Sequence, residues 1–139
     1  LQASGYFADV KDANQAVAKI LAGRELGISP IASLANIYIV KGRITLSANL
    51  MAAQVKRSGR YDYRILQHDA TVCVIEFYEQ GKSVGQSSFT MEDAKTAGLG
   101  GDNWQKYPRN MLNSRAMSNG VKLFCPDVTS GPAYTPDEL

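Results

Sequence analysis

Three strand-like runs that follow one another closely are the feature that most constrains the fold. The runs Tyr61–His68, Thr71–Glu79 and Lys82–Thr90 are rich in Tyr, Val, Ile and Phe, which are enriched in β-strands. The breaks between them, Asp69-Ala70 and Gln80-Gly81, have the two-residue length of a tight hairpin. The sequence therefore predicts a three-stranded antiparallel meander.

The middle run is apolar on both of its alternating faces. One face carries Cys73, Ile75 and Phe77, and the other carries Val72, Val74 and Tyr78. A strand with one face in water normally alternates apolar with polar residues. We therefore expect helices to cover at least one face of the meander.

Before the meander, the sequence predicts two helices, a hairpin and a third helix. Asp12 is expected to cap the first helix, in which apolar residues recur at helical spacing until Gly27 ends it. Ser29-Pro30 begins a short helical turn. The runs Ile37–Val40 and Arg43–Leu46 then form a small β-hairpin around the turn Lys41-Gly42. Ser47 caps the next helix, which runs from Ala48 to about Ser58 and ends at Gly59.

After the meander, the sequence predicts a short helix, a loop and a long helix. Thr90 opens a capping box in which Asp93 takes the place of Glu or Gln, and this helix ends at Ala97. The run 98–103 is rich in glycine and predicts a flexible loop. A long helix follows from about Tyr107 to Phe124 and is stopped by Cys125-Pro126.

These elements predict an α+β fold: a three-stranded antiparallel β-meander and a small β-hairpin, packed against a long helix and additional shorter helices. The length of 139 residues and the 45% hydrophobic content suit one domain. We place that core domain at residues 1–128 and expect 129–139 to be a linker or arm. No apolar run reaches the roughly 20 residues that a membrane-spanning helix needs.

The two cysteines, Cys73 and Cys125, form neither a disulfide framework nor a metal-binding quartet. We expect both to be reduced and at least partly buried, as in a cytoplasmic protein. Neither a metal ion nor another cofactor is predicted.

The long helix is two-faced. Leu112, Ala116, Gly120 and Leu123 form its packing side, and Gly120 would let a neighbouring element approach closely. Arg115, Ser118, Asn119 and Lys122 lie opposite and can all donate hydrogen bonds to phosphate oxygens. A solvated face on any surface helix would show the same pattern, so both interpretations remain open.

Positive charge gathers in the middle of the chain. The net charge is only +2, but residues 41–122 hold twelve Lys or Arg against seven Asp or Glu. Within residues 41–64 there are six basic residues and a single acid, Asp62. Such a patch suits a polyanionic partner, although a solvated surface can carry it too.

The segment Trp104–Arg109 interleaves two aromatic residues with two cations. Bases stack on aromatic side chains at about 1 to 3 kcal/mol per base, and neighbouring cations neutralise phosphates. The segment is therefore typical of a surface that binds single-stranded nucleic acid. A lone tryptophan is also commonly a core residue, so Trp104 can belong to either class.

Enzyme motifs are mostly absent. The glycine-rich run 98–101 lacks the Gly-Lys-Ser/Thr ending of a phosphate-binding loop. The single histidine, His68, has no partner for nucleophilic catalysis and is expected to be a surface polar residue. Metal-dependent nuclease chemistry would need converging carboxylates. The acids Glu76, Glu79, Glu92, Asp93 and Asp102 fit no spacing typical of such a site.

Five runs together resemble the RecT-type phage recombinases, which are single-strand annealing proteins. They are 42–51 (GRITLSANLM), 57–63 (RSGRYDY), 88–98 (SFTMEDAKTAG), 104–112 (WQKYPRNML) and 115–120 (RAMSNG), followed by Cys125-Pro-Asp-Val128. The resemblance covers almost the whole chain and is that of a divergent member. It implies an ATP-independent protein that binds single-stranded DNA, anneals complementary strands and assembles into a homo-oligomeric ring or filament.

The resemblance also implies the setting of that activity, which is phage homologous recombination in the cytoplasm of a bacterial or phage-infected cell. The expected partners are single-stranded DNA, the annealed duplex and a phage exonuclease. The residues expected to contact DNA are Lys41, Arg43, Lys56, Arg57, Arg60, Lys95, Trp104, Lys106, Tyr107, Arg109, Arg115, Asn119 and Lys122. Two alternatives remain: a metal-dependent DNA-processing enzyme such as a nuclease, and a non-catalytic phage interaction domain.

Overall fold

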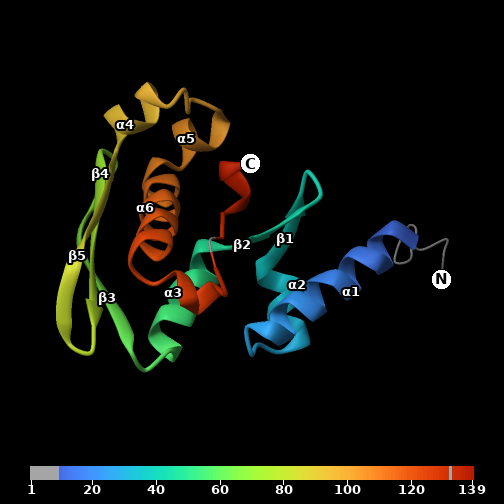
Figure 1. Cartoon of the computed structure of the whole chain (residues 1–139). Coiled ribbons are helices and arrows are strands. Elements are labelled where there is room, and N and C mark those ends of the chain that lie inside the picture. Colours follow the sequence, from blue (N-terminus) through green and yellow to red (C-terminus); the bar gives the residue numbers. More distant parts are fainter. Residues whose placement is uncertain (1–9, 132) are drawn as a thin grey trace.

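The predicted meander forms one side of an α+β structure, with α6 packed beside it (Figure 1). A computed structural model describes residues 10–131 and 133–139. The strands are β1 (Ile37–Val40), β2 (Arg43–Leu46), β3 (Tyr61–His68), β4 (Val72–Glu79) and β5 (Lys82–Thr90). The helices are α1 (Val10–Glu25), α2 (Pro30–Asn36), α3 (Ala48–Arg57), α4 (Met91–Thr96), α5 (Asp102–Lys106) and α6 (Pro108–Phe124). The 3-10 turns η2 (Pro126–Thr129) and η3 (Pro136–Glu138) follow.

Both sheets have the predicted antiparallel pairing. One sheet is the β1–β2 hairpin, and the other has the order β3–β4–β5. The turns Lys41-Gly42 and Gln80-Gly81 have positive φ at both residues, between 51° and 81°. This is the geometry of the two-residue turns whose twist matches that of the flanking strands. Local turn chemistry therefore set the register of the β1–β2 hairpin and the pairing next to the β4–β5 turn, whereas further along the β4–β5 register shifts between Phe77 and Tyr78.

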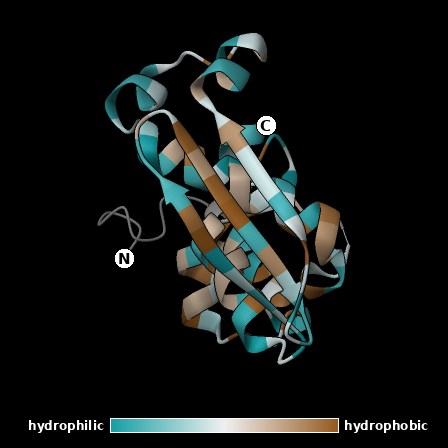
Figure 2. Cartoon of the chain, turned by 90° about the vertical axis from the view of Figure 1, so that its left-hand side faces the viewer, coloured by the Kyte–Doolittle hydropathy of each residue, from teal (hydrophilic) through white to brown (hydrophobic). Residues whose placement is uncertain are grey.

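One face of the meander forms the core. Cys73, Ile75 and Phe77 on β4 are at most 1% exposed, and they face α6. The opposite face has no helix in front of it in Figure 2, where β4 runs through the middle of the sheet. The expectation that helices cover at least one face is confirmed. Register places Arg64 beside Glu76 on the uncovered face.

Gly120 lets α6 approach β4, as expected. A Cβ atom at this position would lie 2.1 Å from Cε1 and 2.4 Å from Cζ of Phe77. Non-bonded carbon atoms normally lie about 3.5 to 4.0 Å apart. The ring of Phe77 therefore occupies the space that any side chain on residue 120 would need.

Three of the predicted helix caps are present. The Ser29 hydroxyl accepts a hydrogen bond from the amide of Ala32, and the Ser47 hydroxyl accepts one from the amide of Leu50. Thr90 and Asp93 form the reciprocal capping box. Each cap satisfies a backbone donor at the helix start.

Three details differ from the sequence expectation. Asp12 lies inside α1 and not at its start, because the described helix already includes Val10. The end of the glycine-rich run is not wholly loop, since Asp102 begins α5. The described part of 129–139 lies against α6 and the β1–β2 hairpin, and does not extend from the core as a linker or arm.

Both cysteines are free and buried. Burial raises the pKa of Cys73 to about 11 and that of Cys125 to about 12. Both thiols therefore stay protonated at neutral pH and behave as small apolar side chains. Across the described residues, no helix combines the length and apolar character that crossing a membrane requires.

Candidate nucleic-acid interface

The expected DNA-binding residues lie on several separate surfaces. In Figure 1 the junction of α3 and β3 lies near one end of α6, and the junction of α5 and α6 lies at the other. Since α6 has 17 residues, these ends are about 25 Å apart. The basic residues of 56–60 and those of 106–109 therefore do not line one compact groove.

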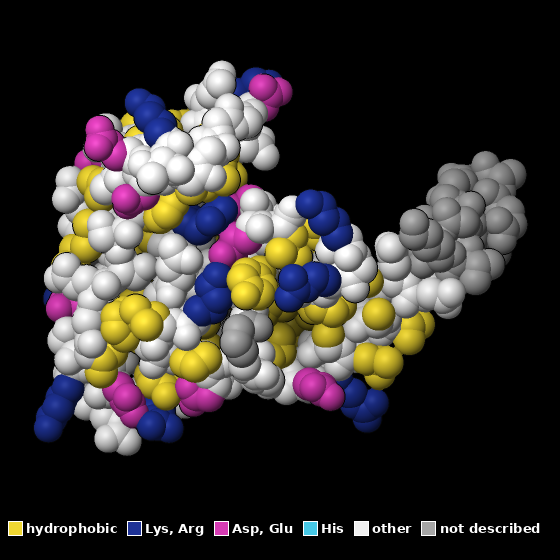
Figure 3. Space-filling view, turned by 45° about the horizontal axis from the view of Figure 1, so that its top comes forward, with side chains coloured by type: hydrophobic (Ala, Val, Ile, Leu, Met, Phe, Trp, Pro, Cys, Tyr) yellow, Lys and Arg dark blue, Asp and Glu magenta, His cyan; other side chains and the backbone are white. Residues whose placement is uncertain are grey.

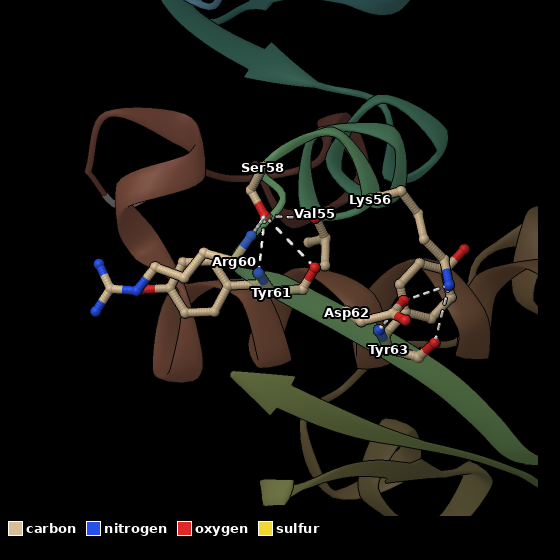
Figure 4. A network of polar contacts seen from close by, with 7 residues as sticks. All are labelled: Val55, Lys56, Ser58, Arg60, Tyr61, Asp62 and Tyr63. Atoms are coloured by element: carbon tan, nitrogen blue, oxygen red, sulfur yellow. Dashed lines mark hydrogen bonds and ion pairs between the residues drawn. The ribbon is translucent and has the colours of Figure 1, made fainter. Parts of the chain in front are cut away.

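The first surface is a cavity of about 680 Å³ at the α3–β3 junction, which we call the tyrosine cleft. Its lining includes Lys56, Arg60, Arg64, Tyr61, Tyr63 and Tyr78. Figure 4 shows Lys56 reaching from α3 to Asp62 and to the backbone oxygen of Tyr63. The Lys56 ammonium also lies 4.6 Å from the centre of the Tyr63 ring.

The cations of the tyrosine cleft have acidic partners. Arg60 Nε donates to a Glu79 carboxylate oxygen at 2.8 Å, and this bond raises the pKa of Arg60. The hydrogen bond from Lys56 lowers the pKa of Asp62. A strand of DNA would have to compete with both carboxylates. Charge on this surface is consequently weaker than a count of its basic residues suggests.

Arg57 does not join Lys56 and Arg60. Its guanidinium donates to the backbone oxygen of Gly27 at 2.9 Å and to the side-chain oxygen of Gln54 at 3.1 Å. Gln54 in turn donates to the backbone oxygen of Leu26. Arg57 thus ties the end of α1 to α3, which is a structural role.

The second surface is the α5–α6 ledge, formed by Lys106, Tyr107 and Arg109. All three side chains are exposed, and Tyr107 is 57% exposed. No ion pair involves the two cations within the described residues. Arg109 donates to the backbone oxygen of His68 at 3.2 Å, and His68 Nε2 lies 2.8 Å from the Arg109 backbone oxygen. These contacts fasten the start of α6 to the end of β3.

Trp104 belongs to the core and not to the ledge. It is 5% exposed, and its ring centre lies 6.1 Å from that of Phe89. Its ring cannot stack on a base while α5 is packed in this way. Of the two interpretations of Trp104, the structure selects the core residue, because burial of the large ring is what holds the short helix α5 in place.

Beside the ledge lies a cavity of about 720 Å³, which we call the asparagine cavity. Its lining includes Asn49, Asn103, Asn110, Asn113, Ser47 and Ser114, together with Tyr38 and Met111. Each amide side chain offers two hydrogen-bond donors and an acceptor. Sequence reasoning missed this cavity. The spacing of Asn110, Asn113 and Ser114 places them on one face of α6, but nothing local joins them to α3 and α5.

The third surface is the basic face of α6, where the C-terminal segment 133–139 lies on Arg115 and Lys122. Lys122 Nζ donates to Glu138 at 2.7 Å, and a terminal nitrogen of Arg115 lies 3.8 Å from Asp137. The Tyr134 ring centre is 4.2 Å from Lys122 Nζ and 5.4 Å from the Arg43 guanidinium carbon. In Figure 3, Lys and Arg side chains gather around apolar and acidic ones at the middle of the visible face.

Glu138 is the best-held acid of that segment. Its carboxylate accepts hydrogen bonds from Ser118 Oγ, Lys122 Nζ and the Thr135 amide, at 2.5 to 2.7 Å. Burial by itself would raise the pKa of Glu138, but these hydrogen bonds and the charge of Lys122 lower it overall. The segment is therefore docked in its ionised form.

This docking predicts a pH dependence of stability. Because the folded pKa of Glu138 lies below its ordinary value of 4.5, ionised Glu138 stabilises the fold above that pH. The contribution is lost as the pH falls through the lower folded value. Urea unfolding at a series of pH values should show wild type more stable than Glu138→Gln at neutral pH. The gap should close in acid, and a gap that does not change with pH would contradict this assignment.

The remaining expected residues are spread over the surface. Lys41 is exposed in the β1–β2 turn, Lys95 is exposed on α4, and Asn119 is half-buried on α6. Three of the five acids named for nuclease chemistry are engaged separately: Glu76 with Tyr78 and Ser83, Glu79 with Arg60, and Asp93 in its capping box. In residues 10–131 and 133–139, no three His, Cys, Asp or Glu side chains are placed to share a metal ion.

Comparison with known proteins finds neither a family model nor a curated protein that matches this chain.

Proposed function

We propose that this chain is a single-stranded-DNA-binding protein that anneals complementary strands without ATP, as part of phage homologous recombination. The observation that carries the proposal is the α5–α6 ledge. Along the chain, the exposed Tyr107 lies between the exposed cations Lys106 and Arg109 there, next to a cavity lined by amide side chains. We propose that the protein works as a homo-oligomer in the cytoplasm and cooperates with a phage exonuclease.

Each part of the ledge suits a different part of a single strand. The face of Tyr107 can stack on a base, and every base has such a face. Lys106 and Arg109 have no carboxylate partner in the described part of the chain, and both can neutralise phosphates. Asn103 and Asn110 line the adjacent cavity and can hydrogen-bond to base edges. Unpaired strands expose these edges, which supports a single strand as the ligand.

The Tyr107 ring provides the first test of this proposal. Tyr107→Ala should weaken binding of a labelled oligothymidylate about tenfold, because one stacked base contributes about 1 to 3 kcal/mol. Tyr107→Phe is the matched control, since it keeps the ring and should bind almost as wild type does. Fluorescence anisotropy at several salt concentrations measures both. Equal binding by wild type and Tyr107→Ala would remove the ledge from the interface.

Annealing of two complementary oligonucleotides in the absence of ATP tests the activity itself. Incubation of labelled DNA with Mg²⁺ or Mn²⁺ is the companion assay. Cleavage that an acid-to-amide substitution abolishes would favour a nuclease, and neither binding nor cleavage would favour a non-catalytic interaction domain. Annealed product without cleavage is the outcome that we expect.

A further inference from the structure

We propose that the basic face of α6 also binds the single strand, and that the C-terminal segment 133–139, which covers this face, is an intramolecular competitor of the strand. This inference rests on the proposed function. It adds the basic face of α6 to the binding surface formed by the ledge and the asparagine cavity. It also gives segment 133–139 control over access to that face.

The asparagine cavity and the basic face of α6 are parts of one continuous helix face. Asn110, Ser114, Ser118 and Lys122 follow one another at intervals of four residues, which places them in one row along α6. The first two line the cavity, and the last two are covered by Glu138. The uncovered part of this row, Asn110 and Ser114, thus ends at the place on α6 where segment 133–139 starts to cover it.

The segment itself forms the boundary. Thr135, Pro136 and Asp137 are part of the cavity lining, between the α6 side and β1. If the segment moved away, the cavity would extend along α6 toward Lys122. Arg43 of β2 and Lys122 of α6 both contact the Tyr134 ring. Without the segment, Arg43 would therefore face the extended cavity from the side of the β1–β2 hairpin.

The segment offers the same chemical groups as a nucleotide strand. The Tyr134 ring lies against two cations, at 4.2 Å from Lys122 and 5.4 Å from Arg43, where a base could lie. Asp137 and Glu138 provide negative oxygens to Arg115 and Lys122, as phosphates would. A base could therefore take the place of the Tyr134 ring, and phosphates could take the places of the Asp137 and Glu138 carboxylates.

One contact in this arrangement is poorly satisfied. Arg115 Nε and Asp137 Oδ2 are both buried and have no hydrogen-bond partner among the residues that the structure describes. A terminal nitrogen of Arg115, not Nε, is the group nearest to Asp137 Oδ2 in an ion pair, and it lies 3.8 Å away, beyond hydrogen-bonding distance. A buried donor without an acceptor is costly, and a phosphate oxygen that reached Arg115 would satisfy it. The Arg115 guanidinium therefore suits a ligand whose oxygen can come within hydrogen-bonding distance, which the Asp137 carboxylate does not.

The segment can leave while the meander and α6 stay folded. It follows a turn in which Ser130 has φ 59° and Gly131 has φ 117°. Its docking combines packing of Ala133 against the core with polar contacts, including a backbone hydrogen bond of 2.9 Å from the Leu46 amide to the Tyr134 oxygen. Hydrogen exchange of the Leu46 amide on β2 therefore reports whether the segment is docked, because docking protects this amide.

The test compares two double variants with the same change in charge. Asp137→Asn/Glu138→Gln removes the negative charges from the segment. Glu25→Gln/Glu92→Gln removes two exposed acids on α1 and α4 and controls for the general gain in attraction to DNA. The probe is a labelled oligothymidylate, followed by anisotropy, and hydrogen exchange at Leu46 is measured with and without it.

We expect the segment variant to bind the probe about tenfold more tightly than the control variant. If the segment is docked in about 90% of the molecules, only about one in ten can bind, and the apparent affinity falls about tenfold. Saturating probe should also speed exchange of the Leu46 amide in wild type. Binding by the segment variant alone, with none by wild type, would support the inference while overturning the ledge as a sufficient site.

Two outcomes would overturn the inference. If wild type binds, the two double variants bind equally and Leu46 stays protected, the segment is not a competitor and the proposed function still stands. If neither wild type nor the segment variant binds the probe at low salt, the proposed function and this inference fall together.

Discussion

Replacing Trp104 with alanine is expected to lower the free energy of unfolding by about 3 to 5 kcal/mol, the usual cost of emptying a buried aromatic site. Trp104 is 5% exposed and packs beside Phe89, so its removal leaves a cavity between α5 and β5. Urea or thermal unfolding, followed by circular dichroism, measures the loss. Trp104→Phe keeps an aromatic ring against Phe89 and should lose less.

This prediction separates the two interpretations of Trp104. If the side chain were a stacking platform, alanine would weaken DNA binding and leave stability nearly unchanged. Tyr107→Ala is the converse variant: because Tyr107 is 57% exposed, its replacement should affect binding without affecting stability. A Trp104→Ala protein as stable as wild type would contradict the packing described here.

Replacing Gly120 with alanine is expected to destabilise the fold by about 3 kcal/mol, at the upper end of the usual cost of overpacking a core. The new Cβ would lie 2.1 Å from the Phe77 ring, which is 1% exposed and has no space to retreat into. Either α6 must move away from β4 or the ring must leave its position. Equilibrium unfolding in urea gives the size of the loss.

Two controls keep this prediction testable even if the single variant does not fold. Gly100→Ala changes a glycine whose Cβ would have no neighbour within 4 Å, and stability should change little. Combining Gly120→Ala with Phe77→Leu removes the ring atoms that clash. The double variant should therefore be more stable than the sum of the two single effects predicts. Simple additivity would show that the Phe77 ring is not the obstacle.

Trp104 and Gly120 also connect the fold to the candidate interface. Trp104 anchors α5, and the chain passes directly from α5 through Tyr107 into α6. Gly120 sets how closely α6 approaches the sheet, and α6 carries both the asparagine cavity and the covered basic face. The positions of the proposed binding groups therefore depend on two buried contacts that DNA never touches.

The sequence by itself determined the elements that depend on neighbouring residues. The two-residue turn at Gln80-Gly81 and the strand-forming runs beside it predicted the β4–β5 pairing, because a short turn leaves few registers open. Ser47 and Thr90 predicted helix starts, since a cap is a contact within three residues. The need for glycine at residue 120 was also visible, although not the ring that it accommodates.

Only the tertiary structure decided which charged and aromatic groups are free to bind. Residue types show that Arg115, Lys122 and Arg60 are cations, but their partners Asp137, Glu138 and Glu79 are 16 to 22 residues away in the chain. The contact between His68 and Arg109 spans 41 residues. The periodicity of a helix or strand shows which residues share a face, but it does not show which distant segment covers that face. Trp104 therefore became a core residue and the segment 133–139 a cover, while Tyr107 stayed exposed, because burial depends on how distant elements pack together.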